Sequence, residues 1–217
     1  MTATHEWHPL DRPLRGAWAR VERAEKLALR LQAFEDETRD DWEYAARVDV
    51  TTDGEGPLPN ERWPVSVDFS LRLGDAVHNL RAALDYLAHD LAPTWKRPKF
   101  PVSRRASEQI PTELRRWDER LRALQPVPDR PENYWLWQLT ELWNYDKHRL
   151  LVAGFAQSRD GWVEDGRIDA TVTIVISART KNGEVIVSDE PVLPFLKRLC
   201  TNVRAVIASF ETDLLDG

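Results

Sequence analysis

The chain has little of several residues that mark particular classes of protein. Its 217 residues include one cysteine, Cys200, and nine glycines. A single cysteine excludes a disulfide within the chain, and Cys200 stands in a late apolar helical pattern where we expect a small buried residue. The glycines do not form a phosphate-binding loop, and no serine stands in a nucleophile-elbow sequence. The sequence therefore excludes a disulfide-stapled fold, a glycine-rich phosphate loop and a nucleophile elbow.

Long hydrophobic runs are missing as well. No apolar stretch approaches the roughly 18 residues that are needed to span a bilayer. The segment from Met1 to Leu10 contains two His, a Glu and a Pro, so it does not resemble a signal peptide. We therefore expect a cytoplasmic protein with no membrane partner.

Charge is unevenly distributed along the chain. The net charge of −6 argues against a surface that coats nucleic acid globally, but a local basic patch is compatible with it. Nine Lys and Arg face four acids from Lys96 to Arg122, whereas ten acids face two Arg from Leu31 to Glu61. Two interpretations stay open: solvated faces that pair with each other, or a phosphate-binding surface in the basic stretch.

Periodicity predicts both helices and strands. Helical spacing of apolar residues predicts helices over residues 11–39, 70–92, 112–124, 131–148 and 191–215. Alternation predicts strands over residues 42–52, 63–69, 150–157, 167–178 and 184–188. Asp160-Gly161 and Asn182-Gly183 are expected to be turns, and the Asn-Gly pair is a strong hairpin signal. The sequence predicts one α+β domain over residues 1–217: a bundle of about four or five helices with a small antiparallel sheet, its strands inserted near 42–69 and 150–188.

A polar stripe interrupts the most regular of these helices. At about 100° per residue, His78, Arg81, Asp85 and His89 fall within an arc of roughly 80°. The opposite side of the same helix is a Leu and Val stripe. Because most of its circumference is expected to be buried, the polar stripe is predicted to face protein, where it needs partners or a function.

A second polar motif ends the helix predicted over residues 131–148. Glu141, Asn144 and His148 lie within a similar arc, and Asp146, Lys147 and Arg149 stand at the helix end. A carboxylate there opposes the helix macrodipole, at a cost of roughly 0.3–1 kcal/mol unless a cation answers it. We expect the two helices to meet in one polar centre, and a bidentate pair between Asp146 and Arg81 would suit both residues.

Several roles fit such a centre. It could be a salt-bridge network that fixes the helix register, a binding site for an anionic ligand, or a metal-free site for RNA cleavage or other phosphate chemistry. A metal site is disfavoured because the spacing matches no compact signature and the neighbouring cations repel a metal ion, so no metal or cofactor is predicted. The candidate catalytic residues are His78, Arg81, Asp85 and His148. The candidate ligand-binding residues are Asn144, Asp146, Lys147 and Arg149.

Tryptophan is abundant, with 10 residues spread along the chain. Trp135, Trp137 and Trp143 share one predicted helix, where core packing or a stacking platform for bases would explain them. The predicted partners are thus RNA or another anionic ligand. Should the polar centre be purely structural, Trp-rich apolar surfaces are expected to mediate a homodimer instead.

The two motifs also resemble known sequences. The segment Leu73 to Asp85, followed by Phe100-Pro101-Val102 and by Asn144 to Arg149, resembles a group of bacterial proteins of uncharacterised activity. A more distant similarity is to the HEPN class of helical bundles, many of which are ribonucleases of toxin and defence systems. Their motif is Arg, four to six residues, then His. Arg72 to His78 has that spacing with Leu73 after the Arg, while Asn144 to His148 matches the second half, with Trp143 in place of Arg. The HEPN similarity implies metal-independent ribonuclease activity.

Overall fold

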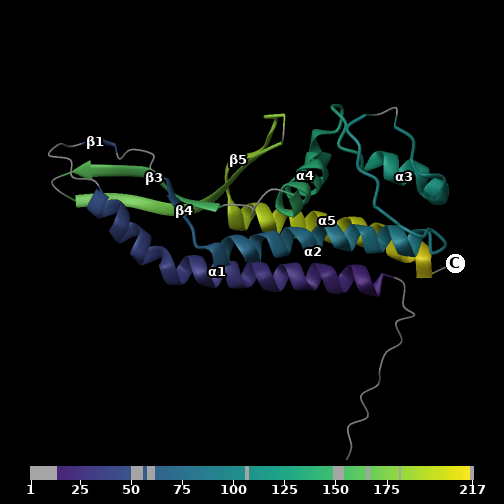
Figure 1. Cartoon of the computed structure of the whole chain (residues 1–217), viewed down its shortest axis with the longest axis horizontal. Coiled ribbons are helices and arrows are strands. Elements are labelled where there is room, and N and C mark those ends of the chain that lie inside the picture. Colours follow the sequence, from purple (N-terminus) through teal and green to yellow (C-terminus); the bar gives the residue numbers. More distant parts are fainter. Residues whose placement is uncertain are drawn as a thin grey trace, which may run out of the picture.

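The structure is a computed structural model. It describes residues 14–49, 56–57, 62–105, 108–148, 154–164, 167–180 and 182–215, and the side chains of residues 14–38, 65–105, 108–145, 173–180 and 182–214. The chain is α+β, as predicted, with a helical bundle at one end and an antiparallel sheet at the other (Figure 1).

Three long helices lie side by side and form the bundle (Figure 1). They are α1 (Arg15–Asp49), α2 (Val67–Leu91) and α5 (Val192–Leu215). The α1 helix runs antiparallel to α5: Arg204 binds Glu25 at 2.7 Å, and Trp18 donates to Glu211 at 3.3 Å one heptad further along. Their apolar stripes, together with that of α4 (Tyr134–His148), close one hydrophobic core.

The first helix is longer than predicted. We expected a strand over residues 42–52, but α1 continues to Asp49. Extending an existing helix adds one hydrogen bond per residue without a new nucleation cost, and the Ala45-Ala46-Arg47 segment has high helix propensity. The alternation of Tyr44, Ala46 and Val48 was therefore overridden by the helix that precedes it.

The start of α2 also differs from the prediction. The expected strand over residues 63–69 is reduced to β2 (Arg62–Pro64), because proline cannot donate a ladder hydrogen bond. Two residues later Ser66 caps α2, accepting a hydrogen bond from the Phe69 amide at 3.1 Å. The helix therefore begins at Val67, three residues before the predicted start at residue 70.

Between α2 and α4 the chain forms a long connector, residues 93–111, and two short helical segments. The helix predicted over residues 112–124 is a 3₁₀ helix, η1 (Thr112–Trp117), followed by α3 (Asp118–Ala123). A further 3₁₀ turn, η2 (Pro131–Asn133), leads into α4. Pro111 precedes η1 and Pro131 is the first residue of η2, and in neither turn does a capping side chain bond the first amides.

The sheet is antiparallel, in the order β1–β3–β4–β5, with β2 also paired to β3. Its strands, apart from β2, are β1 (Gly56–Pro57), β3 (Gly154–Glu164), β4 (Arg167–Arg179) and β5 (Val185–Pro191). Asn182-Gly183 turns between β4 and β5, as predicted, with Gly183 at a φ of 84°. Asp160-Gly161 lies inside β3 at a bulge and not at a turn.

Candidate functional site

Arg81 and Asp85 of the first polar motif form an ion pair on α2. The Arg81 Nη1 atom lies 2.5 Å from Asp85 Oδ1, one helical turn away. The Arg81 side chain is 5% exposed and that of Asp85 27% exposed. A pair this deeply buried needs further hydrogen bonds to offset the desolvation of its charges.

The backbone of Phe100 supplies those hydrogen bonds. Its amide donates to Asp85 Oδ1 at 2.9 Å, and its carbonyl accepts from Arg81 Nη2 at 3.0 Å. Phe100 is itself buried, at 1% exposure. The two side chains thus hold both polar groups of one residue, as a neighbouring strand would, and fasten the connector to α2.

Gln125 fastens the next residues of the connector from the other side. Its amide nitrogen donates to the Pro101 carbonyl at 3.2 Å, and its oxygen accepts from the Ser103 amide at 2.7 Å. A third bond, to the Leu121 carbonyl, anchors the side chain beyond the end of α3. We call Arg81, Asp85 and Gln125 the connector clamp. Gln125 carried no helical periodicity that could have identified it beforehand; its burial depends entirely on how the connector folds back.

Trp143 of α4 joins the same region. Its indole lies over the Arg81 guanidinium, with 5.6 Å between the guanidinium carbon and the ring centroid. The buried Arg81 Nε atom has no hydrogen-bond partner among the described residues, and the electron-rich face of the ring adds to Asp85 in offsetting the positive charge of the guanidinium. Arg81 binds Asp85 and Phe100. The expected pair with Asp146 stays a prediction, because the side chain of Asp146 lies outside the described residues.

His78 also meets Trp143 where α2 and α4 cross. The indole nitrogen donates to His78 Nδ1 at 3.2 Å. That geometry requires Nδ1 to be unprotonated, so a neutral His78 carries its proton on Nε2. His78 is exposed on the surface of α2, whereas Arg81 beneath it is not.

The remaining candidate residues are not gathered into the centre by any described contact. His89 is exposed and contacts Asp90 at 3.4 Å, and Asn144 is half-buried on α4. Asp146, Lys147 and His148 belong to α4, but their side chains, like all of Arg149, lie outside the described residues. Among the described side chains, no group of three or more His, Cys, Asp or Glu could hold a metal ion.

The cysteine is not a nucleophile in this fold. Cys200 is buried on α5, as expected from its apolar surroundings. Burial, reinforced by the negative charge of Glu25, raises the pKa of its thiol to about 11. A thiol with such a pKa stays protonated at neutral pH and is unreactive.

The nine cations between Lys96 and Arg122 divide into two groups. Three have carboxylate partners: Arg104 with Glu184, Arg120 with Asp213, and Arg122 with Asp118. None of these partners comes from the acidic stretch over residues 31–61, so the two oppositely charged segments do not neutralise each other through these three contacts. The other six, all exposed, form no ion pair with a described residue: Lys96, Arg97, Lys99, Arg105, Arg115 and Arg116.

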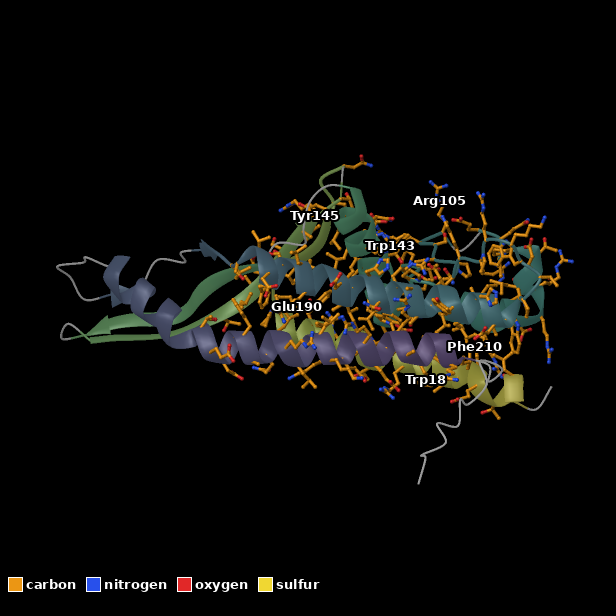
Figure 2. All side chains as sticks on the ribbon, turned by 60° about the horizontal axis from the view of Figure 1, so that its bottom comes forward. Trp18, Arg105, Trp143, Tyr145, Glu190 and Phe210 are labelled. Carbon is orange, nitrogen blue, oxygen red and sulfur yellow. The ribbon has the colours of Figure 1, made fainter. Side chains whose placement is uncertain are left out.

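These six unpaired cations lie on the connector and on η1. The connector, residues 93–111, starts at the end of α2 and runs back along that helix, so that Phe100 lies at Asp85 and Arg104 reaches Glu184 just before β5. The elements η1 and α3 lie at the end of the bundle away from the sheet (Figure 1). Arg105 points away from the helices (Figure 2), and the Arg116 guanidinium lies over Trp117 at 5.0 Å from the ring centroid. The connector and η1 therefore carry positive charge that is not neutralised by ion pairs with described residues.

Comparisons with protein-family models, with curated proteins and with solved structures each found no match to this chain. The similarities to the paired-motif bacterial group and to HEPN domains stay predictions. No helix in the described part of the chain combines the length and apolarity that crossing a membrane requires.

Proposed function

We propose that this protein is a noncatalytic binding module whose connector and η1 bind the phosphate backbone of RNA. The observation that carries the proposal is the set of six unpaired cations on a segment that the connector clamp fastens to the bundle. Unpaired Lys and Arg gain counterion-release free energy on binding phosphates, whereas cations already paired with carboxylates gain less. We expect this to take place in the cytoplasm.

The polar centre supports a structural role for the motif on α2. Both Nη groups of Arg81 form hydrogen bonds, one to Asp85 and one to Phe100, and the residue as a whole is only 4% exposed. Asp85 uses Oδ1 for the Phe100 amide as well as for Arg81. Because Arg81 is buried and these bonds use both of its Nη groups and Asp85 Oδ1, the function of the two side chains in this proposal is to hold the basic connector in place.

Salt dependence tests the proposal directly. The affinity for a labelled single-stranded RNA is measured by fluorescence anisotropy over a range of KCl concentrations. The slope of log K against log salt is about −0.7 per neutralised phosphate for single strands, so six contacts predict a slope of about −4.

Matched triple variants locate the surface. Changing Lys96, Arg97 and Lys99 to Gln is expected to weaken RNA binding at least tenfold and to make the salt slope shallower. Changing Arg23, Lys26 and Arg30 to Gln removes the same charge from an exposed face of α1 and is expected to change the affinity less than twofold. No binding at low salt, or an equal loss in both triple variants, would overturn the proposal.

A metal-independent ribonuclease is the second candidate function. The observation that favours it is the contact of exposed His78 with Trp143 on α4, the helix that also carries His148. An acid and a base on two crossing helices would suit RNA cleavage. This function predicts that the pure protein degrades RNA in EDTA and that His78→Ala and His148→Ala both abolish the cleavage. RNA that stays intact at high protein concentration would exclude it.

A further inference from the structure

A cavity of about 300 Å³ opens beside the connector clamp. Its walls are mostly apolar or aromatic: Trp95, Phe100, Pro101, Val102, Ile110 and Pro111. Trp95 and Ile110 are half-buried, whereas Phe100 is fully buried. The cavity thus has an aromatic wall that can be reached from outside and a floor fixed by the same backbone that Arg81 and Asp85 hold.

The polar groups around the cavity differ in what they can still bind. Gln125 is occupied by the connector backbone, and Ser103 is bonded to Glu108 at 2.5 Å. Lys99 also lines the cavity and is one of the six unpaired cations. One cation, Lys99, and one carboxylate, that of Glu108, therefore stand beside a largely apolar hollow. Lys96 and Arg97 follow Trp95 directly in the chain and add positive charge next to it.

We propose that this cavity receives one unstacked base of a single-stranded RNA, against the indole of Trp95, while Lys99 and its neighbours hold the adjacent phosphates. The inference rests on the proposed function. A volume of about 300 Å³ is at the lower end of ligand pockets, which suits one planar ring system. The apolar walls match the face of a base, and the cations match the charge of the backbone that carries it.

The form of the site also restricts the ligand. A base within a duplex is stacked and paired, so it cannot enter a hollow without being extruded. Gln125 and Ser103 are already bonded, so the exposed Gln109 is the one uncharged polar side chain of the described lining left to read a Watson–Crick edge. The site is therefore expected to prefer single strands over duplexes and to discriminate weakly among the four bases.

An abasic oligonucleotide separates the base from the phosphates. A single-stranded RNA and an abasic RNA of equal length, which carries the same charge, are compared by anisotropy at one salt concentration. The base-bearing strand is expected to bind about tenfold more tightly, as for stacking on an aromatic side chain. Equal binding of the two strands would overturn the cavity proposal and leave RNA binding intact, whereas binding of neither would overturn both.

Variants of the cavity complete the test. Trp95→Ala is expected to remove the difference between the two strands, and Trp95→Phe to restore most of it. Trp95 and Ile110 both pack against the core. The second variant, Ile110→Trp, keeps an apolar side chain at its position while it fills the cavity, and it should lower base-bearing binding alone. Lys99→Gln is expected to weaken both strands equally. Unchanged preference for the base-bearing strand in a folded Ile110→Trp protein would overturn the proposal, as would an equal effect of Ile110→Trp on duplex RNA.

Discussion

Arg81 and Asp85, one turn apart on α2, bind the carbonyl and the amide of the same residue, Phe100. The helix motif and the connector that follows it are thereby two halves of one structural element. This explains why the buried Arg81 does not require a carboxylate from α4: Asp85, the backbone of Phe100 and the ring of Trp143 surround its guanidinium. It also places the basic connector on a rigid support.

The clamp predicts a large stability effect from Asp85→Ala. The change leaves Arg81 buried without its carboxylate and the Phe100 amide without its acceptor, so unfolding should become easier by about 3 kcal/mol in urea denaturation. Asp68→Ala, on the same helix, removes the exposed partner of Arg72 and should cost less than about 1 kcal/mol. Similar losses in both variants would contradict the clamp.

Amide hydrogen exchange distinguishes the two sides of the clamp. Gln125→Ala removes the acceptor of the Ser103 amide, so exchange at Ser103 should accelerate about tenfold. The Phe100 amide, bound by Asp85, should be affected much less. The reverse pattern is expected for Asp85→Ala, and each variant therefore serves as the control for the other. Uniform acceleration along the connector in both variants would show that the two sides are not independent.

The effect of Gly16→Ala on stability is predicted to change sign when the side chain of Tyr86 is removed. A Cβ atom at Gly16 would overlap the ring of Tyr86 on α2. Gly16→Ala should therefore destabilise the wild-type fold by about 1–2 kcal/mol through overpacking. In a Tyr86→Ala background the same change should stabilise by about 0.5–1 kcal/mol, because alanine favours the helix. A thermal-melting double-mutant cycle measures both, and the same sign in both backgrounds would contradict the contact.

Cys200 predicts a loss of stability at alkaline pH. Burial raises the pKa of its thiol from 9.0 to about 11, so the folded state favours the neutral form. The contribution of Cys200 to stability is complete below pH 9 and is lost as the pH rises towards 11. The difference in unfolding free energy between the wild type and Cys200→Ala, measured from pH 7 to 11, isolates this titration from those of Tyr and Lys. A difference that is independent of pH would contradict it.

Predictions from the sequence succeeded where a local pattern and the fold agree. The Leu and Val stripe of α2 located that helix, and Asn182-Gly183 located the hairpin between β4 and β5. The predictions were wrong at Trp42 to Asp49, where a short alternation of apolar residues competed with an adjoining helix. They were also wrong at Asp160-Gly161, which is part of a β-bulge within β3 although this dipeptide is typical of turns. Both errors lie where the neighbouring element, and not the local residues, decides the conformation.

The candidate site shows the same division. The arc of His78, Arg81 and Asp85 was visible from helical geometry, and so was the need of a buried Arg and Asp for partners. The identity of those partners was not, because Phe100 and Gln125 come from segments without periodicity. Almost every residue type offers the same backbone amide and carbonyl groups, so the residue type at position 100 does not indicate that its backbone is bound by side chains.

By itself the sequence determined the α+β class, the polar stripe on α2 and the excess of cations between Lys96 and Arg122. The tertiary structure alone decided which charges stay available. It pairs Arg104, Arg120 and Arg122 with carboxylates and leaves six cations without such partners in the described fold. Composition fixes how many charges a segment carries, but only the distances between side chains that are remote in sequence determine whether those charges are neutralised within the protein or remain for a partner.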